Sequence, residues 1–266
     1  MRQRNIGDRQ QIFTNNTCLE GVITNISVID GGVQKGVLES YSLDNYGITQ
    51  DFFYPDSENL NERVERRRSL SMIPPEYVYK KAAQFDWTLY GEEMTPQKKI
   101  ANAFIVKFSE FRKQGRGLYI FSETKGSGKT MLACCLANEI MDRVDTSVKF
   151  ITAPEYVELI KEKNESSKEI VKSIKECGLL IFDDIGIESG KQSWIDEAIF
   201  YLIDYRDKHM LSTIYTSNFG MESLPGDERS IDRIIGHSVP LKMPEYSVRR
   251  NRAKEKTGNF LKEVLD

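Results

Sequence analysis

Apolar residues follow two alternating patterns in the chain after about residue 95. Short, almost uninterrupted apolar runs predict buried strands, and apolar residues three or four positions apart predict amphipathic helices. The predicted strands lie at residues 117–121, 147–152, 178–184, 212–218 and 238–243. The predicted helices lie at residues 95–115, 130–144, 153–163, 167–177 and 193–210. Strands that alternate with helices and are apolar on both faces indicate an α/β fold, with a mainly parallel five-stranded sheet between helices.

The first 70 residues are patterned differently. Short β-favouring runs between residues 21 and 43 are broken by Gly31-Gly32 and by polar residues, and they show no helical period. A charged run at residues 61–69 follows, and it is most simply a solvated linker or helix. We therefore predict a boundary near residue 70, between a small N-terminal segment (residues 1–70) and a domain at residues 71–266. This pattern does not specify the fold of the N-terminal segment.

The segment that follows the first predicted strand of the domain is rich in glycine. Its sequence, SETKGSGKT, matches the phosphate-binding pattern G-x-x-x-x-G-K-[ST] except that Glu123 replaces the first glycine. Gly126 and Gly128 let the backbone approach phosphates, Lys129 brings a positive charge to them, and the Thr130 hydroxyl is a ligand for Mg²⁺. The first glycine lies at the outer edge of such a loop, so a side chain there points away from the nucleotide if φ stays negative. The competing interpretation is a glycine-rich turn without a ligand.

A second motif favours the nucleotide interpretation. Residues 179–184, LLIFDD, form an apolar run that ends in two aspartates about fifty residues after the loop. Like charges repel, so a buried strand has no packing reason to end in such a pair. Beside Mg²⁺ the pair has a use, because Asp183 can hold the metal through water and Asp184 can polarise the attacking water. The two motifs together predict a site for ATP and Mg²⁺, with Thr130 and Asp183 on the metal and the nucleotide held by Gly126, Ser127, Gly128, Lys129, Thr130 and Met131.

Composition limits the class of protein. The chain has 266 residues, of which 39% are hydrophobic and 29% charged, and no apolar run approaches the roughly 18 residues that span a bilayer. We expect a cytoplasmic protein without a membrane segment. The net charge of −3 argues against a broadly basic surface for duplex DNA but leaves room for a local basic patch. The four cysteines and two histidines do not have the spacing of a tetrahedral zinc site.

Several motifs in order give the chain a family resemblance. From residue 70 to about residue 255 it resembles the DnaC/DnaI/IstB group of AAA+ ATPases, which are bacterial and phage helicase loaders and their transposition relatives. The motifs that carry the resemblance are IPPEY (73–77), FDW (85–87), GSGKT, LLIFDDIG, STIYTSN, ERSIDRI (228–234) and YSVRRNR (246–252). It implies an AAA+ P-loop NTPase with a short C-terminal lid.

The resemblance also implies roles for residues outside the two motifs. Asn218 corresponds to the sensor-1 residue that orients the hydrolytic water, although an asparagine after a strand is often only a turn residue. Arg233 corresponds to the arginine finger, with Arg229 as the alternative. Arg249 corresponds to the sensor-2 arginine, with Arg250 as the alternative because MPEYSVR carries an extra residue. With Lys129 and Asp184, the implied catalytic set is Lys129, Asp184, Asn218, Arg233 and Arg249.

Two further features have a plain and a functional interpretation. Lys168, Lys172 and Lys175 form a stripe on one predicted helix, either a solvated face or, as in related loaders, a contact for single-stranded DNA. Phe85 and Trp87 either flank the adenine or pack in the core.

The resemblance implies a function as well. We expect a slow ATPase that is stimulated by assembly or by single-stranded DNA and that delivers a DnaB-type replicative helicase onto single-stranded DNA. Residues 1–70 would bind the helicase, and ATP would drive self-assembly. Two alternatives stay open: an IstB-like ATPase that acts with a transposase, and a nucleotide-switched adaptor with negligible turnover.

Overall fold

The computed structural model describes residues 6–14, 17–31, 34–43, 48–55, 57–162, 164–187 and 193–265. The chain divides into two compact units, Met1–Arg66 and Arg67–Asp266. The division falls within helix α1 (Ser57–Ser69), close to the boundary near residue 70 that the sequence predicts. Among the described residues, no helix is both long and apolar enough to cross a lipid bilayer.

The N-terminal unit is a four-stranded antiparallel sheet. Its strands pair in chain order, which makes it a simple meander: β1 (Arg9–Thr14), β2 (Thr17–Gly31), β3 (Gln34–Leu43) and β4 (Ile48–Pro55). Ile23, Tyr41 and Leu43 are buried, and Ile26 and Phe52 pack against them. This core is small, because alternate residues of each strand point to opposite faces of the sheet.

The second unit is built on a five-stranded sheet in the order β6-β7-β8-β5-β9. All four pairs of neighbouring strands are parallel. The strands are β5 (Gly117–Phe121), β6 (Val148–Thr152), β7 (Leu179–Ile185), β8 (Ser212–Ser217) and β9 (Ser238–Lys242). The helices are α2 (Thr95–Val106), α3 (Phe108–Lys113), α4 (Lys129–Arg143), α5 (Ala153–Glu162), α6 (Glu165–Glu176), α7 (Ser193–Lys208), α8 (Glu228–His237) and α9 (Val248–Leu265). Short 3₁₀ turns lie at Ala82–Gln84, Trp87–Tyr90 and Met221–Ser223.

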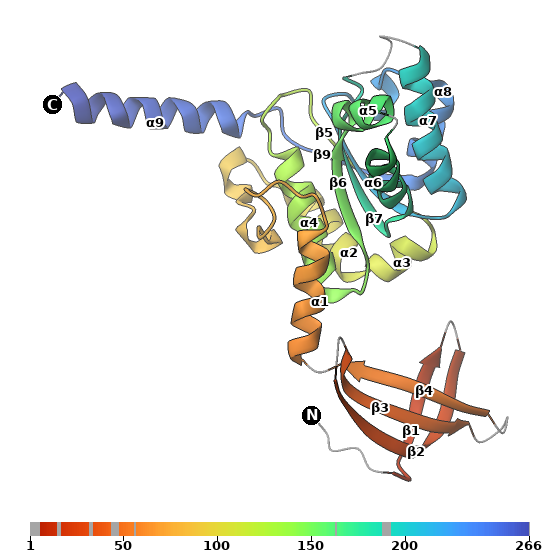
Figure 1. Ribbon diagram of the computed structural model, residues 1–266. Coiled ribbons are helices and arrows are strands. Elements are labelled where there is room, and N and C mark those ends of the chain that lie inside the picture. The colour runs from red at the N-terminus through yellow and green to blue at the C-terminus, as the bar shows by residue number, and fades with distance from the viewer. Residues whose placement is uncertain are drawn as a thin grey trace. The chain divides into compact units, whose positions relative to one another are not determined.

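Helices cover both faces of this sheet, as the sequence predicts (Figure 1). On one face, Leu118 and Ile120 of β5 belong to a core that includes α2 and α4. On the other face, Tyr119 of β5 belongs to a core that includes α5 to α8. The same alternation along β7 and β8 makes both faces apolar, because each strand must supply side chains to two cores. The predicted α/β fold is therefore confirmed.

One predicted helix is divided. The segment expected as a single helix over residues 95–115 is two helices, α2 and α3, which meet at Lys107. Lys107 has φ −109° and ψ 27°, outside the helical range, and two further rings lie against Phe104. The ring centroids of Phe108 and Phe111 lie 5.5 Å and 5.0 Å from that of Phe104, both in edge-to-face geometry. Phe104 and Phe108 are four positions apart and would be neighbours on a straight helix too, so it is the contact between Phe104 and Phe111 that accompanies the break.

Candidate functional site

The glycine-rich segment is a loop that leaves β5 and opens α4. Gly126 and Gly128 have φ values of 79° and 93°, in the left-handed region that glycine adopts without strain. A Cβ atom on Gly128 would lie only 2.9 Å from the Tyr90 hydroxyl, which donates a 2.6 Å hydrogen bond to the carbonyl of Ser127. Both the backbone conformation and the close neighbour therefore require glycine at position 128.

Lys129 begins α4 and is buried, with only 6% of its surface exposed. Its Nζ donates to the carbonyls of Ser122 (3.2 Å) and Thr124 (3.3 Å) and to Oδ1 of Asn218 (2.9 Å). Burial lowers the pKa of Lys129, while the carboxylates of Asp184 and Asp183 act in the opposite direction. A buried ammonium whose hydrogen bonds go to neutral oxygens is suited to attract an anion.

Asp183 is the most buried acid of the site, with 4% of its surface exposed. One carboxylate oxygen accepts a 2.5 Å hydrogen bond from the Thr216 hydroxyl, and the other accepts a 3.1 Å bond from the Thr130 hydroxyl. Burial raises the pKa of Asp183 to about 6, although both hydroxyls stabilise the charged form. The next residue, Asp184, raises this pKa further, so the two carboxylates lie close enough to repel each other.

The pairing of β7 with β8 is irregular at two consecutive aspartates. The pairing of β7 with β8 shifts register between Phe182 and Ile185, and Asp184 has a positive φ of 56°. The Asp184 amide donates to the Thr216 hydroxyl at 2.9 Å. In a regular strand, neighbouring side chains point to opposite faces, and a bulge breaks this alternation. Left-handed backbone at a residue other than glycine is strained, and such strain is found mostly at functional sites.

Strand order brings the parts of the site together. β8 lies between β7 and β5, so the ends of three adjacent parallel strands carry the two aspartates, Asn218 and the glycine-rich loop. This is the carboxyl edge of a parallel sheet, where ligands of open α/β folds bind. The structure thus brings together Lys129, Thr130, Asp183 and Asn218, which lie up to 89 positions apart in sequence.

These residues fit the ATP and Mg²⁺ that the sequence implies. The two glycines and the start of α4 form an anion-binding turn, because the first amides of a helix have no partner within the helix. Thr130 and Asp183 place two oxygens 3.1 Å apart. Mg²⁺ takes oxygen ligands and is commonly held by one or two protein groups together with substrate phosphates.

Glu123, where the pattern has glycine, is exposed. In the described part of the chain, the non-glycine residues with positive φ are Met72, Asp184 and Met210, so Glu123 keeps an ordinary backbone conformation. Its amide donates to the Glu245 carboxylate at 3.1 Å. The position does not depend on the conformational freedom of glycine.

Of the two sensor-2 candidates, Arg249 lies against the loop. Its amide donates to the Gly126 carbonyl at 3.2 Å, and its Cβ atom would be 2.9 Å from a Cβ atom placed on Gly126. The residue stands in the first turn of α9, a helix that extends away from the sheet in Figure 1. The extra residue before Arg249 therefore does not move it away from the loop.

Arg233 lies on α8, and its ion pairs are with α7. Its guanidinium lies 2.6 Å from a carboxylate oxygen of Asp204 and 4.9 Å from the ring centroid of Phe200. Its side chain is 29% exposed. Arg229, the alternative, pairs with Asp227 at 2.6 Å, and its side chain is 62% exposed. Within one chain, neither arginine has a hydrogen bond or ion pair with the glycine-rich loop among the described contacts.

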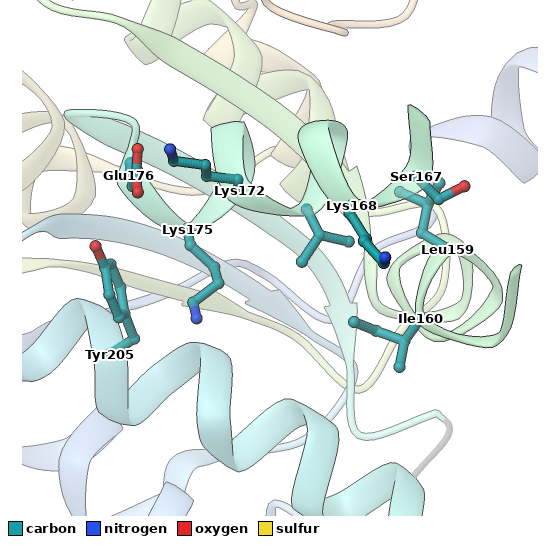
Figure 2. Close-up of a pocket in the computed structure, with 9 residues that line it drawn as sticks. Leu159, Ile160, Ser167, Lys168, Lys172, Lys175, Glu176 and Tyr205 are labelled. Atoms are coloured by element: carbon teal, nitrogen blue, oxygen red, sulfur yellow. The ribbon is translucent and has the colours of Figure 1, made fainter. Parts of the chain in front are cut away.

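The lysine stripe on α6 borders an apolar hollow of about 560 Å³ (Figure 2). Leu159, Ile160 and Val171 supply apolar walls, and the ammonium of Lys175 lies 4.4 Å from the ring centroid of Tyr205 on α7. Of these lysines, Lys175 therefore stands against an aromatic ring, whereas Lys168 and Lys172 are exposed. Lys168 pairs with Glu165 on the same helix.

Arg206, on α7, forms hydrogen bonds with the C-terminal end of α6. Although only 1% exposed, it donates to the carbonyls of Ile174, Lys175 and Cys177, at the end of α6, and to Ser212 on β8. A buried guanidinium with its donors satisfied in this way has a structural role.

Phe85 is buried and packs in the core. Its ring centroid lies 4.7 Å from that of Trp87, and its Cζ atom would be 3.4 Å from a Cβ atom on Gly128. The core interpretation therefore accounts for Phe85, which supports the loop from behind.

Sequence reasoning missed three residues of the site: Thr216, Tyr90 and Glu245. Thr216 had a recognisable signal, because it is a hydroxyl residue at the end of a buried strand and two positions before Asn218. Tyr90 and Glu245 had none, since only the tertiary structure places them against the loop.

Comparison with known proteins agrees with this geometry. The sequence model of the family described as IstB-like ATP binding protein matches residues 57–256. The replicative helicase loader DnaI of Bacillus subtilis (strain 168) is 32% identical over 124 residues, which are 46% of this chain and 39% of DnaI. The replicative helicase loader DnaC of Escherichia coli (strain K12) is 27% identical over 128 residues, 46% of this chain and 51% of DnaC. The matches thus span about half or less of the curated relatives' lengths.

The fold agrees as well. A crystal structure of DnaI superimposes with a TM-score of 0.56 and 26% identity, and it covers 65% of this chain and 96% of that chain. The sheet order and the loop between β5 and α4 are therefore those of an AAA+ P-loop ATPase. Because the family match extends over most of the chain, the protein belongs to the IstB-like ATP-binding family of AAA+ proteins.

Proposed function

We propose that this protein is a helicase loader that binds and hydrolyses ATP and delivers a replicative DNA helicase onto single-stranded DNA. The observation that carries the ATP part is the meeting of Lys129, Thr130, Asp183 and Asn218 at the carboxyl edge of the sheet. The loading part is supported by the similarity to DnaI and DnaC, both of which are replicative helicase loaders.

Each residue of the cluster has a role that its contacts support. The loop amides and Lys129 would bind the β- and γ-phosphates, and Thr130 and Asp183 would hold Mg²⁺. The bound metal would neutralise charge that develops on the phosphates during transfer. Lys129 now donates to the Ser122 and Thr124 carbonyls, and it would exchange these bonds for phosphate oxygens.

Asp184 and Asn218 would act on the attacking water. Asp184 follows Asp183 at the irregular end of β7 and acts on the pKa of Lys129, and Asn218 is 2.9 Å from Lys129, which supports a place for both beside the γ-phosphate. We assign Asp184 to polarising the water and Asn218 to orienting it. Hydrolysis would form a bond from the water oxygen to the γ-phosphorus and break the bond from that phosphorus to the terminal oxygen of ADP, and the Asp184 carboxylate would accept the proton that the water loses.

Two arginines would complete the site. Arg249 is the sensor-2 residue, supported by its contacts with Gly126 in the same chain. Arg233 would act in trans, on the nucleotide of a neighbouring copy, once it leaves its ion pair with Asp204. An arginine finger supplied in trans typically accelerates hydrolysis by about 10³-fold or more.

The stripe on α6 would contact the single-stranded DNA. Lysine charges attract the phosphate backbone of a nucleic acid. Lys172 and Lys175 border the hollow and would supply this charge (Figure 2), whereas the Tyr205 ring already packs against Lys175 and His209. Such binding would not depend on sequence and would weaken as salt increases.

ATP binding is tested with Lys129→Ala and a matched control in the same loop, the exposed Lys125→Ala. A fluorescent ATP analogue should bind wild type and Lys125→Ala alike, and it should show no measurable affinity for Lys129→Ala. Equal binding to Lys129→Ala and Lys125→Ala would contradict the assignment of Lys129 to the nucleotide site.

Action in trans is tested by mixing variants. Arg233→Ala should bind ATP normally but hydrolyse it poorly, and a mixture with Lys129→Ala should recover part of the rate, because each supplies the half of the site that the other lacks. If Arg229→Ala shows this behaviour and Arg233→Ala does not, the finger is Arg229. Two results together would contradict a shared site. The specific ATPase rate of wild type would be independent of protein concentration, and neither Arg233→Ala nor Arg229→Ala would change that rate.

A transposition role is the second candidate, because the matching family model is described as IstB-like. The two roles share the ATP site and differ in partner. A pull-down with residues 1–70 that captures a replicative helicase supports loading, and capture of a transposase supports the second role.

A further inference from the structure

Two segments far apart in the sequence run side by side at the outer edge of the phosphate loop. Residues 121–126 leave β5, and residues 243–249 connect β9 to α9. Backbone bonds join them at both ends: the Met243 amide donates to the Phe121 carbonyl at 2.7 Å, and the Arg249 amide donates to the Gly126 carbonyl at 3.2 Å.

Side chains fill the interval between these two bonds. The Ser122 hydroxyl lies 3.1 Å from the carbonyl of Pro244, and the Ser247 hydroxyl donates to the carbonyl of Lys125 at 2.9 Å. The whole connection before α9 is therefore bonded to residues 121–126, which form the first part of the loop.

Glu245 makes the central contacts of this interval. One of its carboxylate oxygens accepts from the Glu123 amide at 3.1 Å, and the other accepts from the Thr124 amide at 2.7 Å. The Ser122 hydroxyl is within 3.1 Å of the second oxygen. A carboxylate that receives successive amides in this way holds a turn firmly, because charge-assisted hydrogen bonds are roughly twice as strong as neutral ones.

The position of these amides makes the contact informative. They belong to the residue that replaces the first glycine of the loop pattern and to the residue after it. Both amides face Glu245, so they are not free to bind a phosphate. The first turn of the loop is thus set from outside, by a side chain of the β9–α9 connection.

We propose that Glu245 is a positioning residue of the nucleotide site: it fixes the first turn of the phosphate loop and ties that turn to the start of α9. The effect on nucleotide binding rests on the proposed ATP site, whereas the anchoring of the loop does not. Because the loop holds the nucleotide in the ground state and in the transition state alike, loss of the anchor weakens binding without slowing the chemical step.

The anchor is tested first in nucleotide-free protein by hydrogen exchange of the Glu123 and Thr124 amides. Glu245→Ala should make the Glu123 amide exchange about tenfold faster or more, because its carboxylate acceptor is gone, and the Thr124 amide, which also donates to the Ser122 hydroxyl at 3.2 Å, should exchange faster by a smaller factor. Glu92→Ala, which removes an exposed carboxylate elsewhere, should leave the exchange unchanged. Unchanged exchange in Glu245→Ala would overturn the anchoring and with it the proposal.

Binding and turnover are tested next. Glu245→Ala should raise both the Kd for ATP and the KM about tenfold while kcat stays within about twofold. The Kd and KM of Glu245→Gln should lie between those of wild type and Glu245→Ala. The glutamine oxygen can accept from one amide, whereas the glutamine NH₂ group opposes the other amide.

The outcomes separate this proposal from the proposed function. If wild type binds no ATP, the proposed function fails while hydrogen exchange still tests the anchor. If wild type binds ATP and Glu245→Ala has the same Kd and KM, the positioning role is wrong and the ATP site stands. A lower Tm with unchanged Kd and KM would make Glu245 merely structural, which also overturns the proposal.

Discussion

Asp183→Asn should stabilise the ligand-free protein while it removes a ligand of the proposed metal site. The Asp183 carboxylate is buried beside Asp184, and its pKa is raised from 3.8 to about 6. Ionisation therefore costs more in the folded chain than in the unfolded chain. An asparagine has nearly the same shape and never ionises, so the variant avoids this cost.

The sign and size follow from linkage. Between about pH 4 and pH 6, the folded protein holds a proton that the unfolded chain has already released, so stability falls as pH rises through this window. Each unit of pKa difference between the two states corresponds to about 1.4 kcal/mol. Wild type should therefore lose about 3 kcal/mol across the window through this group, and Asp183→Asn should not.

The assay is urea unfolding of wild type and Asp183→Asn at several pH values from 4 to 8, without nucleotide and with a chelator. Asp232→Asn, which alters an exposed carboxylate, serves as the control. The free energy of unfolding of Asp183→Asn relative to wild type should rise with pH and level off above about pH 6. Addition of Mg²⁺ and ATP should reverse the order, because only wild type gains stability from binding.

Two results would refute this reasoning. If Asp183→Asn is less stable than wild type at pH 7.5 without ligands, the hydrogen bonds from Thr130 and Thr216 outweigh the cost of burying the charge. A stability difference that does not change between pH 4 and pH 7 would show that Asp183 does not titrate in this window.

Three further variants test separate parts of the structure. Thr216→Val removes the hydroxyl that donates to Asp183 and accepts from the Asp184 amide, so kcat should fall about tenfold and the acidic limb of the pH–rate profile should move to higher pH; an unchanged profile would contradict this. Arg206→Leu leaves buried carbonyls at the end of α6 without donors, so urea unfolding should show a loss of about 3–5 kcal/mol, whereas a loss under 1 kcal/mol would show that water replaces the guanidinium. Glu123→Gly should change ATP affinity little in a binding titration, because this side chain is exposed, and a collapse of binding would reveal a role for it.

The sequence by itself determined the local parts of the site. Gly126, Gly128 and Lys129 are recognisable because a phosphate loop needs certain residues at fixed intervals along one turn, and spacing along the chain sets that geometry. The same holds for Asp183 and Asp184, whose charges have no packing reason to end an apolar strand. Strand positions in the α/β domain also followed from local pattern, since a strand covered on both faces must be apolar throughout.

The first unit and the strand order were decided by tertiary structure. Polar residues interrupt the segments that become β2 and β3, and their register depends on pairing between strands that local pattern does not encode. Nothing in the spacing of the motifs places β8 between β7 and β5 either. That order is what brings Asn218 to Lys129 and Thr216 to Asp183.

Contacts between distant segments were likewise beyond the sequence. Glu245 lies more than 120 positions after the amides that it holds, and its partners are backbone groups, which every residue carries. Arg249 and Arg250 are neighbours at the start of α9, and what separates them is a tertiary contact: the Arg249 amide donates to the Gly126 carbonyl. A sequence motif identifies residues that act together within one segment. The packing of the whole chain determines which distant segment contacts that motif.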